Sequence, residues 1–288
     1  MSYRARMPVM VVTDSTAYLP VDVAATHPVT IVPLTVTISG RDGSEGLDVT
    51  PTDVAKALSE RRASVTTSRP APAQFAAVYR KLLDDGALGV LSVHLSARLS
   101  GTYSSAVAAA DEFGDLVSVV DSASTGMGLG FPALAAVETA VAGQDLATVR
   151  AAAIAAAERT TTLFYVDTLE FLRRGGRIGA ASALLGTALA VKPILHVTEG
   201  EVRLREKVRT ASRALARMVE LAAEAAGDST VDVAVHHLGA PERADALEAE
   251  VGRRLGDRIR HRYRSEVGAA VAAHVGPGMA CVVVNRLA

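Results

Sequence analysis

Short apolar runs alternate with amphipathic segments along the first half of the chain. Runs rich in β-branched residues predict strands at 9–13, 29–37, 89–94 and 116–120, and the intervening pattern predicts helices at 51–62, 72–83, 101–113, 126–141 and 145–160. Thr50, Pro51 and Asp53 form the start signal of the first of these helices. Because the strands are almost continuously apolar, they fit a parallel sheet that helices cover on both faces. We therefore expect an α/β domain here.

The pattern changes after about residue 163. Strands at 194–198 and 202–208 are separated by Glu199 and Gly200, which predicts a hairpin, and an amphipathic helix at 210–226 follows. Further strands are expected at 231–236, 258–264 and 278–285, with helices at 242–255 and 267–274. Strand pairs joined by turns predict an α+β domain. We therefore expect an N-terminal parallel-sheet domain at residues 1–162 and a C-terminal α+β domain at residues 163–288.

Composition narrows the classes of protein that fit. A formal net charge of −1 gives no overall field that favours nucleic acid. The apolar run at 9–12 stops at Asp14, and the longest membrane-like run, 178–191, meets Lys192 and Pro193 too soon to span a bilayer. We expect a soluble, cytoplasmic protein. Trp is absent and aromatic residues make up 4% of the chain, so Ala, Val and Leu must fill the core.

Familiar catalytic and metal-binding patterns are missing from the sequence. It has no GxxxxGK[ST], HExxH or GxSxG motif, and the glycines at 126–130 have the wrong spacing for dinucleotide binding. His236 and His237 have no carboxylate or thiol at ligand spacing, so we expect no metal. The single cysteine, Cys281, lies in an apolar run and is expected to be a buried, inert thiol.

Four loops at strand-to-helix junctions are rich in hydroxyl side chains: TDST at 13–16, TTSRP at 66–70, SARLSGT at 96–102 and DSASTG at 121–126. Each alone also fits an ordinary helix cap. Together they place neutral hydrogen-bond donors at helix N-termini, which favours a small anion such as a carboxylate. Gly101 would let the backbone approach such a ligand closely.

Two further clusters remain open to two interpretations. The segment RRGGRIG at 173–179 fits a cationic loop beside an anionic ligand or partner, and equally a helix C-terminus whose arginines complement the dipole. It lacks the interleaved aromatic residues of a nucleic-acid site. His274 precedes the turn at 276–278 and fits either a helix cap or a donor to an anion.

Taken in order, these segments resemble the DegV family. The matching segments are TDST at 13–16, TSxP at 67–70, LSGTY at 99–103, DS at 121–122, LRRGGRI at 172–178, KPI at 192–194 and HxGPG at 274–278. Each match is weak by itself. The ordered set covers nearly the whole chain.

The resemblance implies a two-domain fold with a long-chain fatty acid between the domains. It places the carboxylate on Thr67, Ser100 and His274, with Ser68, Ser96 and Gly101 beside them. It associates Arg177, with Arg174 beside it, with the acyl-phosphate end and a partner. The implied role is a carrier subunit that needs no cofactor and presents the fatty acid to a separate kinase. An acyltransferase or a membrane surface is a further candidate partner.

Two residues depart from the family pattern. Arg69 stands where a polar uncharged residue is usual, and Val275 replaces a common threonine. Arg69 either pairs with the carboxylate or points to solvent. The expected apolar walls of the ligand tunnel are the segments 75–83, 127–134, 164–169 and 180–194.

Other functions fit parts of the same pattern. Arg258, Arg260, Arg262 and Arg264 alternate along one strand, as on a solvated edge strand or as a docking stripe for an acidic partner or membrane. A lipid-sensing regulatory protein would have the same sequence features as a carrier. An enzyme of the dihydroxyacetone-kinase-like type would need His94 or His274 for its chemistry.

Overall fold

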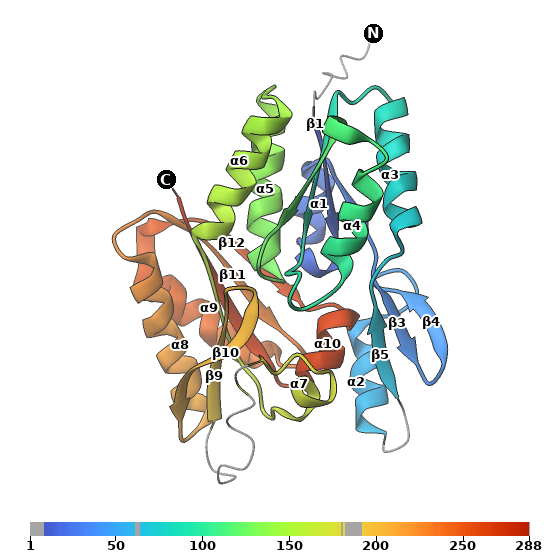
Figure 1. Ribbon diagram of the computed structural model, residues 1–288. Coiled ribbons are helices and arrows are strands. Elements are labelled where there is room, and N and C mark those ends of the chain that lie inside the picture. The colour runs from blue at the N-terminus through green and yellow to red at the C-terminus, as the bar shows by residue number, and fades with distance from the viewer. Residues whose placement is uncertain (1–8, 61–63, 180, 182–191, 288) are drawn as a thin grey trace.

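The computed structural model describes residues 9–60, 64–179, 181 and 192–287. Two large sheets lie one above the other in Figure 1, and a third, small sheet lies beside them. The expected α/β fold with a parallel-sheet domain and a second, sheet-rich domain is confirmed.

The first sheet is parallel, with strand order β2-β1-β6-β7. Its strands are β1 (Val9–Asp14), β2 (Val29–Val32), β6 (Gly89–His94) and β7 (Val117–Asp121), and its helices are α1 (Val21–Thr26), α3 (Pro72–Asp84), α4 (Thr102–Ala110), α5 (Met127–Val141) and α6 (Leu146–Glu158). Alternation along β1 places Val11 in a core with α5 and α6, and Val12 in a core with α3 and α4. Helices therefore cover both faces, as the apolar strands predicted.

A small antiparallel sheet interrupts this domain. It consists of β3 (Thr35–Ile38), β4 (Arg41–Ser44) and β5 (Val65–Ser68), in the order β4-β3-β5. One strand was expected at 29–37, and the chain instead leaves the first sheet after β2. Pro33 lies at this break and has no N–H to continue a ladder.

The helix between β4 and β5 of the small sheet begins where its sequence predicted. Helix α2 (Pro51–Ser59) carries a capping box in which Thr50 and Asp53 bond each other's backbone N–H groups. It packs against α10 (Ala269–Val275), which belongs to the C-terminal part of the chain. The small sheet and α2 therefore lie beside the second domain (Figure 1).

The second sheet is mixed, with strand order β10-β9-β8-β13-β11-β12. Its strands are β8 (Thr160–Tyr165), β9 (Lys192–Thr198), β10 (Glu201–Val208), β11 (Val231–His237), β12 (Ile259–Glu266) and β13 (Ala280–Arg286). Glu199 and Gly200 both have positive φ, and they form the predicted hairpin turn between β9 and β10. The expected domain boundary at 162/163 falls inside β8.

The two faces of this sheet have different neighbours. Helices α8 (Ala211–Ala226) and α9 (Pro241–Leu255) cover one face, where Val282 and Val284 point. Cys281 and Val283 point to the other face, which packs against α10, α5 and the short helix α7 (Glu170–Arg174). The core on this second face contains residues from both domains, so it holds them together. In the described residues, no helix is long and apolar enough to cross a membrane.

Candidate functional site

A cavity of about 240 Å³ lies between the two domains and beside the small sheet. Leucine, valine, phenylalanine and methionine side chains make up much of its wall. Two arginines, Arg69 and Arg177, also line it, whereas none of the described residues that line it is an aspartate or a glutamate. An apolar cavity with positive charge and no acid is fitted to an amphiphilic anion.

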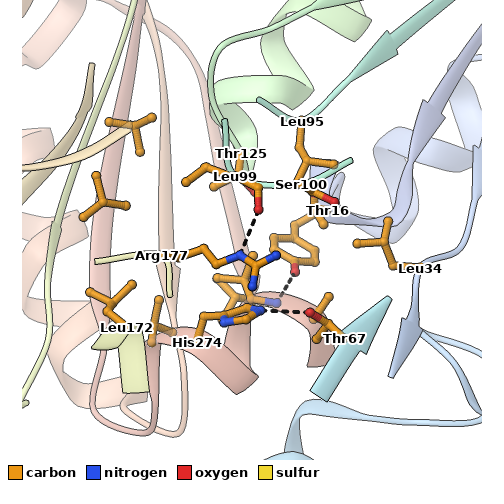
Figure 2. A pocket seen from close by; sticks show the side chains of 18 of the residues that line it. Thr16, Leu34, Thr67, Leu95, Leu99, Ser100, Thr125, Leu172, Arg177 and His274 are labelled. Carbon is orange, nitrogen blue, oxygen red and sulfur yellow. Dashed lines mark hydrogen bonds between the residues drawn. The ribbon is translucent and has the colours of Figure 1, made fainter. Parts of the chain in front are cut away.

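Thr67 and His274 meet in this cavity although 207 positions separate them (Figure 2). Thr67 lies on β5, His274 lies in the last turn of α10, and Thr67 Oγ1 is 2.9 Å from His274 Nε2. Burial and the nearby Arg177 guanidinium lower the pKa of His274 to about 4. The imidazole is therefore neutral at pH 7, and its Nδ1 is buried without a hydrogen-bond partner among the described residues.

Glycines make room for His274. A Cβ on Gly175 would lie 2.1 Å from His274 Nδ1, so only glycine permits this contact. Gly276 has a φ of 72° and follows α10, and a Cβ there would lie 2.1 Å from Phe171. Gly175 is therefore explained by packing against the imidazole, and Gly276 by its positive φ and the nearby Phe171 ring.

Ser100 fits both interpretations of its loop, as a helix cap and as part of a ligand site. Its hydroxyl lines the cavity, hydrogen-bonds the Thr102 hydroxyl at 2.9 Å, and accepts the Thr102 N–H at 3.3 Å at the start of α4. Gly101 has no side chain to hinder Arg69, whose Nη1 would lie 2.3 Å from a Cβ there. The TSxP and SGT loops therefore meet across the cavity, and Arg69 lies over the second of them.

Arg177 links the two domains at the cavity. Its Nε donates to the Leu99 carbonyl at 2.9 Å (Figure 2). Its Nη1 donates to the Gly175 carbonyl at 2.5 Å. Neither Arg177 nor Arg69 forms an ion pair within the described residues. Both guanidinium groups therefore bring positive charge that no neighbouring carboxylate neutralises.

Two expected site residues lie elsewhere. Ser96 is buried outside the cavity lining, where its hydroxyl donates to the Gly200 carbonyl at 2.7 Å and accepts the Arg98 N–H at 3.1 Å. Arg174 is exposed at the end of α7 and pairs with Glu170 at 2.8 Å. Arg174 thus fits the second interpretation of the segment 173–179, in which its arginines lie at a helix C-terminus. Ser68 and Gly101, by contrast, do line the cavity.

The apolar walls differ from those expected. The segments 75–83 and 127–134 do not line the cavity. Phe75 and Tyr79 of the first segment are buried between α3 and the first sheet. The second segment belongs to α5, whose side chains pack into the core of the first domain and into the core between the domains. Phe164 lines it as expected. Most of the segment 180–194 lies outside the described residues. The remaining wall comes from Leu34, Val197, Val202, Val267 and Val271, which single residue patterns do not distinguish from ordinary core.

Cys281 also lines the cavity, and burial raises the pKa of its thiol to about 12.

His236, which the sequence analysis considered only as half of a histidine pair, is a further lining residue. Its Nε2 accepts the N–H of Met127 at 3.0 Å, and its Nδ1 is 3.0 Å from the Ser265 hydroxyl. Because that hydroxyl donates to the Tyr18 carbonyl, Nδ1 must be the donor. His236 is thus a neutral cap for α5.

His94 is fully buried and its two nitrogens are occupied. Nδ1 is 3.0 Å from Asp14 Oδ2, and Nε2 is 2.6 Å from the hydroxyl of Ser92, which accepts from Tyr79. Asp14 accepts three further bonds, from Leu95 and Thr16. His94 therefore has no access to a substrate, and the enzyme alternative is left with His274 alone.

The arginines of β12 are largely engaged within the molecule. Strand β12 is an edge strand, as expected. Arg260 forms a two-pronged pair with Asp232, and Arg264 pairs with Asp245. Arg258, which directly precedes the strand, donates to the carbonyls of Leu255 and Gly227. These contacts favour the edge-strand interpretation over a docking stripe.

Comparison with known proteins places the chain in a family. The family model described as "Uncharacterised protein, DegV family" matches residues 8–286. A DegV domain-containing protein of Streptomyces coelicolor is 52% identical over 284 residues, which is 96% of this chain and 98% of that protein.

Solved structures agree with this match. A DegV family protein of Thermus thermophilus, described for its fatty acid binding, has a TM-score of 0.92 and 36% identity, over 97% of this chain and 100% of that one. DegV of Bacillus subtilis, described as a fatty acid binding protein, has a TM-score of 0.87 and 31% identity, over 98% and 100%. The expectation drawn from the ordered motifs is confirmed: this chain belongs to the DegV family.

Proposed function

We propose that the chain binds a long-chain fatty acid in the interdomain cavity, with the carboxylate at Thr67, Ser100 and His274. The observation that carries this proposal is the lining itself: an apolar cavity with two arginines, several hydroxyl groups and no acid among the described residues. The fatty acid binding of the Thermus and Bacillus relatives supports the same ligand class.

Elementary energetics fit this ligand. Each buried CH₂ group stabilises the complex by about 0.8 kcal/mol, so a chain of about sixteen carbons gains on the order of 10 kcal/mol. A carboxylate loses its hydration on entry and needs donors in return. The Ser100 hydroxyl is such a donor, and so is the Thr67 hydroxyl when Nε2–H of the neutral His274 ring donates to Thr67 Oγ1. Arg177 and Arg69 add charge nearby.

We further propose that the protein is a carrier that presents the carboxylate to a separate kinase for acyl-phosphate formation, as its resemblance implies. Two features of the cavity support this role. Ser68 and Arg69 line the cavity and are also exposed to solvent, so the head-group end is within reach of another protein. Within the described residues, no lining side chain other than His274 is both unpaired and suited to acid–base chemistry.

Native mass spectrometry of the gently purified protein tests the ligand. We expect a bound mass near that of a C16–C18 fatty acid, and a nucleotide or sugar mass instead would contradict the proposal. Thr67→Ala and Ser100→Ala should each weaken fatty acid binding about tenfold while the protein stays folded, since each removes a bond to a charged group. Thr66→Ala is the matched control, because Thr66 neighbours Thr67 on β5 but does not line the cavity.

The carrier role needs its own test. The loaded protein is mixed with ATP and the candidate kinase, and acyl-phosphate is trapped with hydroxylamine. We expect product only when all three components are present. Product from this protein and ATP alone would show that it is an enzyme, and no product with a kinase that acts on another DegV protein would favour a sensor.

A further inference from the structure

One buried carboxylate near the cavity belongs to no part of the site described so far. Glu45 follows β4 and is 5% exposed, yet it has no cationic partner within the described residues. Its Oε1 accepts the backbone N–H of Ala270 at 2.8 Å and the hydroxyl of Tyr18 at 3.1 Å, and its Oε2 accepts the hydroxyl of Ser15. A buried charge is costly, so these bonds must compensate for lost water.

The bonds of Glu45 end on the first turn of α10. This helix has only seven residues, and its N-cap residue, Gly268, supplies no side-chain bond. The N–H of Ala270 bonds Glu45, the N–H of Val271 bonds the Tyr18 hydroxyl at 3.1 Å, and the N–H of Ala272 bonds the Gly268 carbonyl. A residue 225 positions away therefore caps the helix, and its negative charge lies at the positive end of the dipole.

The close approach of Glu45 is built into the sequence of α10. A Cβ on Gly268 would lie 2.3 Å from Glu45 Oε1 and 2.5 Å from the Tyr18 ring, so a larger residue would displace the carboxylate. The same carboxylate also fixes the opposite wall. Ser15, which bonds Glu45, accepts the N–H of Leu34 at 2.9 Å, and Glu45 donates its own N–H to the Leu34 carbonyl at 2.9 Å. Leu34 lines the cavity.

Helix α10 transmits this anchoring to the head-group site. Ala270 and His274 are four positions apart, so they lie on the same face of the helix, about one turn from each other. Both line the cavity, as do Val271 and Val275. A shift of the first turn therefore moves the imidazole relative to Thr67, which lies on a different element.

We propose that Glu45 is a positioning residue for the site: its buried carboxylate anchors the first turn of α10 and thereby holds His274 against Thr67. The link to ligand binding rests on the proposed function. The link to the imidazole does not, because the Thr67–His274 contact exists without a ligand. Glu45 does not line the cavity.

Three variants and two measurements test this. The variants are Glu45→Ala, Glu45→Gln and Asp232→Asn. The measurements are the ring-nitrogen NMR signals of His274 in ligand-free, ¹⁵N-histidine-labelled protein, and the affinity for palmitate. Asp232 is the matched control, since it is also a buried carboxylate with bonds to a guanidinium and a backbone N–H, but it lies between β11 and the edge strand β12.

Glu45→Ala should shift or broaden the His274 signals and weaken palmitate binding on the order of tenfold. Glu45→Gln keeps an oxygen for Ala270 and Tyr18, so it should restore most of both properties. Asp232→Asn should lower thermal stability without changing either. Wild-type His274 signals in Glu45→Ala would overturn the inference, and an equal effect of Asp232→Asn would reduce it to general destabilisation.

Two outcomes need separate treatment. If Glu45→Ala does not fold, Glu45→Asp replaces it: this variant keeps the charge, is too short to reach Ala270, and must move the His274 signals if the inference holds. If the wild-type protein binds no palmitate, the proposed function fails. The NMR comparison still decides whether Glu45 positions His274.

Discussion

Two buried histidines, His236 and His274, face the cavity from different elements. Burial lowers the pKa of each to about 4, and the desolvation of the ring is the largest cause in both. Both ring nitrogens of His236 form hydrogen bonds, Nε2 with the Met127 N–H and Nδ1 with the Ser265 hydroxyl. In His274, Nε2 lies beside the Thr67 hydroxyl and Nδ1 has no partner in the part of the chain that the structure describes. The same residue type is thus a structural cap in one place and a ligand donor in the proposed site.

These pKa values predict acid sensitivity. In the unfolded chain both imidazoles take up a proton near pH 6.5, whereas in the folded protein they stay neutral until about pH 4. The unfolded state binds more protons in this window, so stability is full above pH 6.5 and is lost as the pH falls toward 4. For His236 the loss is on the order of 3 kcal/mol.

Urea denaturation at pH 7, 5.5 and 4.5 measures this loss. His236→Gln keeps an acceptor for the Met127 N–H and removes the titration, so its stability should fall less steeply with pH than that of the wild type. Equal slopes for the two proteins would show that other groups cause the acid sensitivity.

At the scale of elements, the turn after α7 separates two roles of glycine. Gly175 has ordinary helical backbone angles, and a Cβ there would strike only His274. Gly176 has a φ of 69°, and a Cβ there would meet nothing within 4 Å. Gly175 is therefore required by the packing of the imidazole, whereas Gly176 is required by the backbone conformation of the turn.

This contrast gives a paired prediction. Gly175→Ala should weaken fatty acid binding about tenfold or more with little loss of stability, because it displaces His274 without straining the backbone. Gly176→Ala should cost about 1 kcal/mol of stability and leave binding nearly intact. Isothermal titration and thermal unfolding of both variants check it, and an interchange of the two effects would contradict the assignment.

The sequence predicted individual helices and strands better than it predicted which of them pack together. Helix α2 and the hairpin of β9 and β10 follow from local signals, namely the Thr50–Asp53 box and two turn residues. The small sheet was missed because β4 has a polar sequence, β5 is distant in sequence from its partner β3, and each strand has only four residues. Ser96 was misplaced for a related reason: a hydroxyl in a loop looks the same whether it faces a ligand or, as here, the Gly200 carbonyl.

On the scale of the whole molecule, one apolar core joins the two domains around the cavity. Tyr18, Leu34 and Phe131 from the first part of the chain share it with Leu195, Val267 and Val283 from the second. Arg177 and the Thr67–His274 bond cross the same interface. Motif order along the chain identified the family, but only the packing of this interface brings the motifs together.

Because both domains form the cavity wall, ligand should stabilise the molecule as a unit. Delipidated protein should unfold in one transition, and palmitate at about one hundred times its Kd should add on the order of 2.7 kcal/mol of stability. Calorimetry with and without palmitate checks this. Two separate transitions, only one of which shifts with palmitate, would show that a single domain holds the ligand.

The 207 positions between Thr67 and His274 have a consequence for when the proposed lipid site forms during synthesis. A nascent chain that has folded its first domain still lacks the imidazole, the Arg177 guanidinium and most of the apolar wall. In the proposed function, such a chain would stay empty until His274 has been synthesised and docked. The same spacing means that proteolytic separation of the domains would release the ligand without cutting any residue that touches it.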